Sequence, residues 1–372
     1  MPDNLFYDQD TAMRYYFDHA AAARPDDETL EFYLAEMKRH FANQEALHDL
    51  AYQARMRLTE AAGELLEALL PDSAGLGVIW SDSATSCFRL LANYLAGCKT
   101  ISGKLEHPAL TANFKKQTLL TELTAGRDGQ LVLPPELPKA EAAVFHHVQS
   151  ETGAIQDLDR LFAAFPRALH ITDAVQSAAK LPLNRSADIQ IISGIKFGAP
   201  GGAAILYRKK APLMDKFPVF AAAFRTRDHA LSRVSVPLCS ALAFAARRRS
   251  IKLADNLAKV KILAAHTISV MEANGFHPLL APPAPSSPYI CNFLLPGIQS
   301  AVIVRALSAC GVRCASGSAC ASETGEPSRA LLSMGLSCDE AFSALRISFD
   351  ADQEIKDVDF MLSALLEALK NY

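Results

Sequence analysis

Short apolar segments alternate with longer mixed segments between residues 76 and 208. The apolar segments are four to seven residues long and rich in β-branched side chains, which is typical of strands. We predict strands at residues 77–80, 98–102, 130–133, 142–148, 169–175, 189–194 and 203–208. Several are apolar at nearly every position, which indicates burial on both faces. The pattern therefore predicts a mostly parallel seven-stranded sheet covered by helices on both sides, an α/β fold.

The C-terminal third of the chain follows a different pattern. Residues 239–275 have a helical pattern, and the proline-rich stretch 281–288 then interrupts it. Beyond it we predict a strand at 289–295, an amphipathic helix at 300–311, a strand at 343–349 and a helix at 353–370. This order predicts a second, smaller α+β unit.

Length and composition agree with a globular protein of two domains. The chain has 372 residues, of which 50% are hydrophobic and 21% charged. We assign residues 15–255 to a large domain, and residues 1–14 and 256–372 to a small domain. The net charge of −3 carries no footprint for nucleic acid, which is not an expected partner.

Membrane insertion and secretion are not expected either. The longest apolar stretch, residues 234–246, precedes three arginines and could imitate a stop signal, but it is shorter than the ~20 residues that span a bilayer. We interpret it as a buried helix with a basic end. The first ten residues lack the basic start and apolar stretch of a secretory signal, so we expect a cytoplasmic protein.

Eight cysteines in a chain of this length do not form a disulfide framework. No CxxC pair occurs and no histidine lies at a zinc-like interval, so we expect reduced thiols and no metal. Four cysteines have apolar neighbours and are interpreted as packing residues: Cys87, Cys98, Cys239 and Cys291.

Polar residues that directly follow the predicted strands are the candidates for chemistry, because ligands of open α/β sheets bind beyond the carboxyl ends of the strands. Lys196 lies in "SGIKFGAPGG", residues 193–202. Burial there would lower the pKa of the lysine and favour the neutral amine that forms imines. The alternative is a lysine in a surface turn.

Two further segments have a ligand-binding interpretation. Asp173 ends a strand in "HITDAVQSAAK", and a carboxylate buried there needs a cation, such as the protonated ring nitrogen of pyridoxal phosphate. The alternative is a helix cap. The hydroxyl-rich stretch 81–91 precedes a helical run and predicts a phosphate cradle, with a simple cap as its alternative.

These segments occur in this order together with "KLEHPAL" (104–110) and "SETGAIQD" (150–157). In this combination the chain resembles the NifS/IscS-type cysteine desulfurases, within the class V aminotransferase family of fold-type I pyridoxal-phosphate enzymes. The resemblance extends from residue 16 to residue 349. It implies the fold-type I architecture, pyridoxal 5'-phosphate as cofactor and a homodimer with active sites at the interface.

The resemblance also implies roles for individual residues. Lys196 is the Schiff-base lysine, Asp173 pairs with the ring nitrogen, Gln176 binds the ring hydroxyl, and His107 stacks on the ring as a catalytic residue. Thr85 and Ser193 hold the phosphate, with Ala84 beside them in the cofactor site. Arg346 takes the substrate carboxylate, with Ser150 in the substrate site.

The run "CASGSACASETGEPS", residues 314–328, contains Cys314 and Cys320 among small and polar residues. Cys320 is either a small buried filler or a nucleophile on a loop that swings. The resemblance places Cys320 on the catalytic cysteine of the family and favours the nucleophile, whereas we interpret Cys314 as structural.

The implied reaction converts L-cysteine to L-alanine and leaves a persulfide on Cys320 for transfer to a sulfur-acceptor protein, as in iron–sulfur cluster biogenesis. The chain departs from the family pattern at Ile195, which replaces a histidine, and at Gln149 and Ser150, which replace two asparagines. Arg233 aligns with a threonine that reaches the partner subunit's phosphate. We expect Arg233 to contact that phosphate or the substrate carboxylate, the alternative being an interface salt bridge.

Four other functions remain compatible with these residues. The same fold could act as a selenocysteine lyase, as a cysteine-sulfinate lyase or as a class V aminotransferase, although an aminotransferase has no use for Cys320. The fourth is a degenerate, non-catalytic relative that acts as a binding or regulatory partner. The argument against it is the joint retention of the chemical residues Lys196, Asp173, Gln176, His107 and Arg346.

Overall fold

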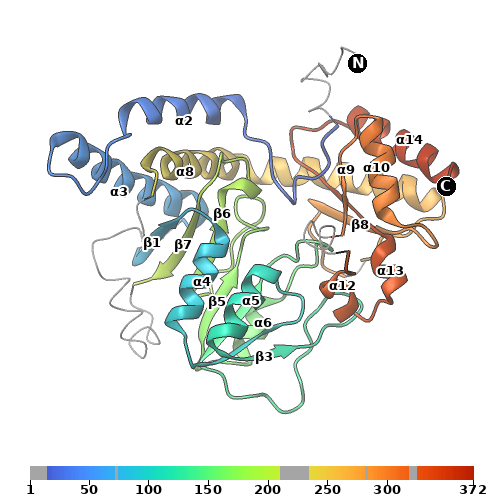
Figure 1. Cartoon of the computed structure of the whole chain (residues 1–372), viewed down its shortest axis with the longest axis horizontal. Coiled ribbons are helices and arrows are strands. Elements are labelled where there is room, and N and C mark those ends of the chain that lie inside the picture. Colours follow the sequence, from blue (N-terminus) through green and yellow to red (C-terminus); the bar gives the residue numbers. More distant parts are fainter. Residues whose placement is uncertain (1–14, 72–73, 210–233, 281–283, 318–324) are drawn as a thin grey trace.

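The computed structural model describes residues 15–71, 74–209, 234–280, 284–317 and 325–372. Its larger unit is built on a seven-stranded sheet. The strands are β1 Leu76–Ser81, β2 Lys99–Gly103, β3 Leu119–Leu123, β4 Ala142–His146, β5 Leu169–Asp173, β6 Ile189–Ser193 and β7 Ala203–Arg208. Their order in the sheet is β1-β7-β6-β5-β4-β2-β3 (Figure 1).

The sheet is mostly parallel, as predicted. Strands β3, β2, β4, β5 and β6 pair in parallel, whereas β7 runs antiparallel to both β6 and β1. Every residue of β4 and β6 is buried, which explains their continuous apolar pattern. The carboxyl ends of β4, β5 and β6 therefore lie at one edge of the sheet, where the candidate residues follow.

One predicted strand is wrong. Residues 130–133 form no strand, and Leu131 makes only an isolated bridge with Ala125. The seventh strand is instead β3, which lies at the edge of the sheet and pairs only with β2. Except for Leu123, the residues of β3 are exposed or half-buried, so its sequence lacks the continuous apolar run of the central strands.

Helices cover both faces of this sheet (Figure 1). The helices of the larger unit are α2 Asp27–Arg39, α3 Asp49–Leu69, α4 Ala84–Tyr94, α5 Pro108–Gln117, α6 Leu158–Ala163 and α8 Val236–Ile251. Helices α4 and α5 pack on one face. Helices α3, α8 and α6 pack on the other.

Helix α8 confirms the buried-helix interpretation of residues 234–246, because most of its residues are buried and Arg248 and Arg249 lie in its last turn. Among the described helices, none is long and apolar enough to cross a membrane. The helical stretch predicted from 239 to 275 is two helices, since α8 ends at Ile251 and α9, Leu253–Ala273, begins beyond Lys252.

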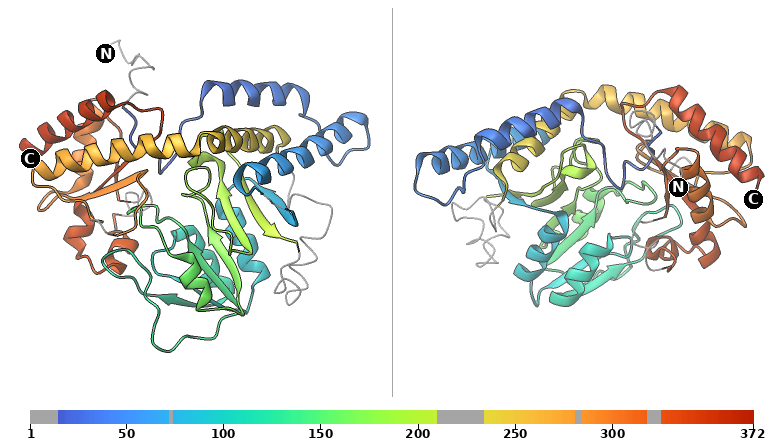
Figure 2. Two further views of the ribbon diagram at one scale, coloured as in Figure 1. Left: turned by 180° about the vertical axis from the view of Figure 1, so that it is seen from behind. Right: turned by 45° about the horizontal axis from the view of Figure 1, so that its top comes forward.

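The smaller unit is α+β, as predicted. It contains α9, β8 Ile290–Leu294, α10 Ser300–Ala309, β9 Ala315–Ser316, α12 Arg329–Ser333, α13 Cys338–Ser343, β10 Ala344–Ser348 and α14 Ile355–Lys370. Its three strands form an antiparallel sheet in the order β8-β10-β9. Figure 2 shows α9 leading from α8 across to this unit. The domain boundaries given above remain a prediction.

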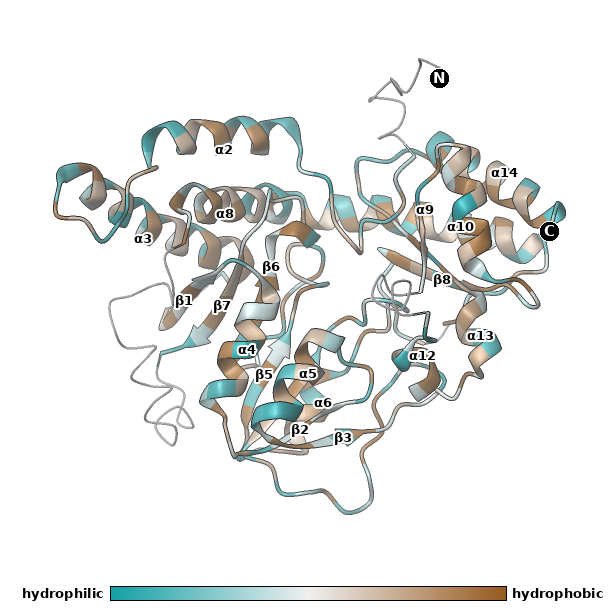
Figure 3. Ribbon diagram, in the orientation of Figure 1, coloured by the Kyte–Doolittle hydropathy of each residue, from teal (hydrophilic) through white to brown (hydrophobic). Residues whose placement is uncertain are grey.

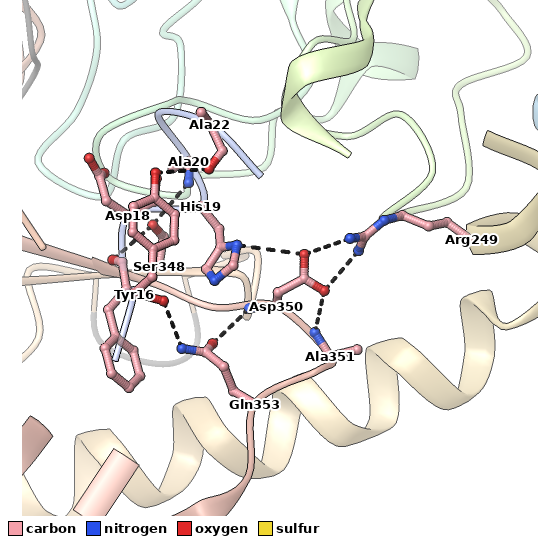
Figure 4. Close-up of polar contacts among 11 residues, drawn as sticks. Tyr16, Asp18, His19, Ala20, Ala22, Arg249, Ser348, Asp350, Ala351 and Gln353 are labelled. Atoms are coloured by element: carbon pink, nitrogen blue, oxygen red, sulfur yellow. Dashed lines mark hydrogen bonds and ion pairs between the residues drawn. The ribbon is translucent and has the colours of Figure 1, made fainter. Parts of the chain in front are cut away.

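A buried charged cluster joins the N-terminal segment, the end of α8 and the turn after β10 (Figure 4). The guanidinium of Arg249 donates to both carboxylate oxygens of Asp350 at 2.8 Å, and His19 Nδ1 lies 3.7 Å from the same carboxylate. Burial alone would raise the pKa of Asp350, but Arg249 and then His19 outweigh it and lower the pKa to about 2. Asp350 is therefore ionised and paired at neutral pH.

Replacing Asp350 with Asn should lower the free energy of unfolding by about 3–5 kcal/mol, because Arg249 would remain as a buried charge without its anion. The matched control is Arg248→Ala, since Arg248 pairs with the more exposed Asp26 and Glu28 and its loss should cost about 0–1 kcal/mol. Urea denaturation at pH 7 measures both losses.

The pH dependence provides a second measurement. The carboxylate of Asp350 contributes its stability above the ordinary pKa of 3.8 and loses it as the pH falls toward the lowered value of about 2. The difference in the free energy of unfolding between the native chain and Asp350→Asn should therefore become smaller as the pH falls over that interval. A difference that is equal at all pH values, or equal losses for Asp350→Asn and Arg248→Ala, would contradict the assignment.

Candidate functional site

One pocket collects polar side chains from the carboxyl ends of β4, β5 and β6, from the segments before α4 and α5, and from β10. The structure brings nine of the predicted site residues to this pocket: Ala84, Thr85, His107, Ser150, Asp173, Gln176, Ser193, Lys196 and Arg346. These residues span 263 positions of the chain, from 84 to 346. The other two, Arg233 and Cys320, lie outside the described residues.

Asp173 is the last residue of β5 and is buried. Its Oδ1 accepts a hydrogen bond from the N–H of Val175 at 3.0 Å. Burial raises the pKa of Asp173 to about 6 against that bond, and the Glu106 carboxylate adds to the rise. Residues 175–180 form turns, so Asp173 does not cap a helix. A cationic ligand in the pocket would stabilise its ionised form.

Lys196 ends a short 3-10 helix, Gly194–Lys196, directly after β6. Its Nζ donates to the carbonyl oxygen of Ala21, and the side chain is half-buried along the pocket. The backbone here is tightly packed, since a Cβ added at Gly194 would lie 2.5 Å from the carbonyl oxygen of Gly201. The surface-turn alternative does not describe this lysine, because it lines the pocket.

The start of α4 serves both as a cap and as a part of the pocket. The side chain of Ser83 accepts a hydrogen bond from the N–H of Ser86 at 3.2 Å. Ala84 and Thr85 follow in the first turn, where backbone N–H groups have no partner within the helix, and both residues line the pocket. An anionic group would be stabilised there by these N–H groups and by the helix dipole.

His107 lies at the start of α5, where its Nδ1 accepts a hydrogen bond from the N–H of Ala109 at 3.1 Å. This bond leaves the proton of the neutral ring on Nε2 and fixes the orientation of the ring. The ring is accessible from the pocket, yet the surrounding protein desolvates the imidazolium. With the charge of Lys196, this desolvation lowers the pKa of His107 to about 4. A neutral, oriented ring suits stacking on a planar ligand.

Arg346 comes from β10 of the smaller unit and already has two partners. Its Nη2 donates to Asp18 Oδ1 at 2.7 Å, and its Nη1 donates to the carbonyl oxygen of Ser150 at 3.0 Å. Its Nε is buried without a hydrogen-bond partner among the described residues. The guanidinium is therefore held at the pocket wall by Asp18, a contact that the sequence did not predict.

The sequence analysis also missed Glu106, His146 and Glu151, which line the same pocket. Glu106 Oε1 accepts a hydrogen bond from the backbone N–H of His146 at 3.2 Å and lies 2.9 Å from its Nδ1. His146 lies inside the predicted strand 142–148, and Glu106 lies in "KLEHPAL" beyond the predicted strand 98–102, so neither directly follows a predicted strand. The contact between them is one that the sequence does not specify.

Gln149 has a structural role at the departure from the family pattern. Its side-chain oxygen accepts hydrogen bonds from the N–H of Glu151 at 2.6 Å and from that of Thr152 at 2.7 Å. The residue is buried and closes the turn that carries Ser150. The longer amide side chain thus orders the backbone that Arg346 contacts.

The sequence profile of the family described as "Aminotransferase class-V" matches residues 15–361. The chain belongs to the class V aminotransferase family. This family uses pyridoxal phosphate. The resemblance to NifS/IscS-type cysteine desulfurases is also confirmed, because distant relatives carry those names.

The alignments with two of these relatives cover nearly the whole of this chain. The cysteine desulfurase of Rhodobacter capsulatus is 25% identical over 378 residues, which covers 95% of this chain and 96% of the relative. A putative cysteine desulfurase IscS 1 of Bacillus subtilis is 24% identical over 386 residues, which covers 96% and 99%.

Solved structures share the class V fold. A NifS-like protein superposes with a TM-score of 0.81 at 20% identity and covers 97% of this chain and 100% of that protein. The apo cysteine desulfurase of Thermococcus onnurineus superposes with a TM-score of 0.82 at 17% identity and covers 97% and 96%. The predicted fold-type I architecture is confirmed.

The pocket residues fit the class V cofactor. Gln176 donates from Nε2 to the carbonyl oxygen of Ala20 at 2.8 Å, whereas its buried Oε1 has no partner in the described chain. Unpaired buried polar atoms are costly, so Oε1 calls for a ligand donor such as a ring hydroxyl. The Asp173 carboxylate lines the pocket and would pair with a cationic ring, and the N–H groups in the first turn of α4 would bind an anion. These residues match a pyridinium ring and a phosphate.

Cys314 is not placed to act as a nucleophile. It is buried, and desolvation raises the pKa of its thiol to about 12, so it does not supply a thiolate at neutral pH. Of the four predicted packing cysteines, Cys87, Cys239 and Cys291 are buried and Cys98 is half-buried. Ile195 remains exposed beside Lys196.

Proposed function

We propose that this protein is a pyridoxal-phosphate-dependent cysteine desulfurase, which converts L-cysteine to L-alanine and leaves a persulfide on Cys320. The observation that carries the proposal is the convergence of Asp173, His107, Lys196 and Arg346 on one pocket. The names of the distant relatives support the same activity.

Asp173 would hold the protonated ring nitrogen of the cofactor, and Gln176 Oε1 would accept from its hydroxyl group. His107 would stack on the ring, while the N–H groups at Ala84 and Thr85 and the hydroxyl of Ser193 would hold the phosphate. Bound pyridoxal phosphate supplies an electron sink for the charge left when an α-proton is removed.

Lys196 has the position of the proton carrier, because its side chain lines the pocket. Its amine would take the α-proton of L-cysteine and later return a proton to carbon. Arg346 would bind the substrate carboxylate through its unpartnered Nε together with one of its Nη groups. Asp18 keeps the guanidinium in place for this contact.

Cys320 would then attack the substrate sulfur as a thiolate. The carbon–sulfur bond of the substrate breaks, a sulfur–sulfur bond forms on Cys320, and the former cysteine carbon takes up a proton to become the methyl group of alanine. Gly317, three residues before Cys320 in the sequence, lies next to the pocket, since a Cβ added there would lie 3.8 Å from Glu151 Oε2. Reduced thiols persist in the cytosol, which suits this chemistry.

A homodimer is part of the proposal. Helix α2 contains hydrophobic positions among hydrophilic ones (Figure 3). Its Leu30, Leu34 and Met37 are exposed in this chain. Exposed Ile195 adjoins Lys196. A second subunit would cover such a surface, and Arg233 would contact the phosphate or substrate carboxylate in the partner's site. The persulfide would pass to a sulfur-acceptor protein.

Incubation of the purified chain with pyridoxal phosphate and L-cysteine tests the proposal. We expect a visible absorption band that borohydride abolishes, equimolar alanine and sulfide in the presence of added thiol, and a persulfide on Cys320 without it. If the protein binds the cofactor but acts only on selenocysteine or cysteine sulfinate, or only as an aminotransferase, the proposal of L-cysteine desulfuration would be replaced by that activity. Failure to bind the cofactor would refute the proposal.

A further inference from the structure

Three ionisable side chains lie together at the carboxyl ends of β4 and β5, on the pocket wall: Glu106, His146 and Asp173. Each is at least nine-tenths buried. Glu106 Oε1 lies 2.9 Å from His146 Nδ1, which makes a buried ion pair when the imidazole is protonated. Asp173 is the residue that would hold the ring nitrogen of the cofactor.

His146 and Asp173 are direct partners in the parallel pairing of β4 with β5. Adjacent strands lie about 4.8 Å apart, and paired residues point to the same face of a sheet. His146 Nε2 and Glu106 Oε2 are buried and have no hydrogen-bond partner within the described ranges. The imidazole therefore lies beside Asp173 with one N–H group uncommitted.

The surroundings of His146 favour its protonated form, because two carboxylates face the imidazole. Burial alone would lower the pKa of His146, but the Glu106 carboxylate, through its charge and its hydrogen bond, and then Asp173 reverse this and raise it. The pKa of the neighbouring His147 is shifted in the opposite direction. Burial lowers the pKa of His147 to about 4, and the charge of His146 adds to the fall.

With His146 protonated, the two carboxylates and one imidazolium sum to a net charge of −1, which one pyridinium ring would neutralise. Without the imidazolium, two carboxylates would face each other in a buried site, and such pairs retain a proton. Glu106 already raises the pKa of Asp173, whereas His146 and Lys196 lower it. His146 thus offsets the effect of Glu106 on Asp173.

We propose that His146 is a positioning residue that keeps Asp173 ionised next to the ring nitrogen of the bound cofactor. The inference rests on the proposed pyridoxal-phosphate site. An ionised Asp173 keeps the ring nitrogen protonated, and the protonated ring is the stronger electron sink. Besides Glu106 and Asp173, the charge of Lys196 acts on this site, and it lowers the pKa of Asp173 and of the neutral His107. The neighbouring His147 is coupled to His146.

The test compares pyridoxal phosphate with its 1-deaza analogue, in which carbon replaces the ring nitrogen, as ligands of the apo full chain. The native protein should prefer pyridoxal phosphate. His146→Gln should reduce this preference about tenfold, because a neutral amide leaves Glu106 free to repel the Asp173 carboxylate. The matched control is His147→Gln, which removes the next histidine, a residue that does not line the pocket, and should leave the preference unchanged.

The double variant Glu106→Gln/His146→Gln separates this mechanism from simple structural damage. Removing the Glu106 charge should restore the preference, since Asp173 then has no neighbouring carboxylate. The ¹⁵N resonance of ring-labelled cofactor reports the same change directly, with a pyridinium shift in the native and double variants and a pyridine-like shift in His146→Gln. His146→Asn serves as the second neutral amide if the glutamine variant does not fold.

An unchanged preference in the folded single variant, no recovery in the double variant, or an equal loss in His147→Gln would overturn the inference. Failure of the native protein to bind pyridoxal phosphate would instead refute the proposed function. Normal binding with a pyridinium resonance in every variant would leave the proposed function intact and remove the role of His146.

Discussion

Lys196→Ala protein should form no borohydride-reducible bond with pyridoxal phosphate and should release alanine from L-cysteine about 10²–10⁴-fold more slowly than the native chain, or not at all. The variant loses both the amine that bonds the cofactor and the base for the α-proton. Cofactor affinity should survive in part, because Asp173, Gln176 and the start of α4 remain.

The rival for this role is Lys180, the other lysine near the site. It is fully buried, burial lowers its pKa to about 7, and its Nζ lies 5.7 Å from the centre of the Tyr289 ring rather than on the pocket wall. A neutral amine at this position could form an imine, but Lys180 does not line the pocket. Mass spectrometry of the reduced native protein should locate the adduct on Lys196, and an adduct on Lys180 would contradict the assignment.

The exposed Lys104 provides the matched control for general lysine loss. Lys104→Ala should retain the visible band and the activity, since the side chain does not line the pocket. A visible band that borohydride still abolishes in Lys196→Ala would also disprove the role of Lys196.

Cys320→Ser should bind pyridoxal phosphate with native absorption, accept L-cysteine, and yet release alanine at least about 10³-fold more slowly, with no persulfide on the protein. A hydroxyl group is far less nucleophilic toward sulfur than a thiolate, so the reaction should stop after removal of the α-proton. Peptide mapping after L-cysteine treatment without added thiol measures the persulfide.

Two other cysteines control for this result. Cys310 is exposed and Cys314 is buried with a raised pKa, so serine at either position should leave the persulfide on Cys320. Undiminished sulfur release by Cys320→Ser, or a persulfide mapped to Cys314, would show that another thiol or another mechanism operates.

The central strands of the large sheet could be predicted from local sequence patterns. Strands β4, β5 and β6 are buried on both faces, so their continuous apolar runs are local signals that need no tertiary information. The same holds for α8 and α14, whose patterns are helical along the chain. The polar residues at the ends of these strands include Asp173 and Lys196, so both could be named as candidates, and the resemblance to the family implied their roles.

Features that depend on residues far apart in the chain could not be predicted from the local sequence and became known only from the folded structure. Residues 130–133 have the composition of a strand but make only an isolated bridge, between Leu131 and Ala125, whereas β3 pairs with β2 along its whole length. The ion pair between Asp18 and Arg346 joins residues 328 positions apart. Such contacts leave no periodic signal, since nothing local to either residue specifies its partner.

The site divides in the same way. Composition and position named residues that could bind a cofactor, but only the register of β4 against β5 put His146 beside Asp173. Only the fold brought the Glu106 carboxylate to His146 across 40 positions. Protonation states follow from burial and from the distances between charges, which are properties of the packed molecule rather than of the chain.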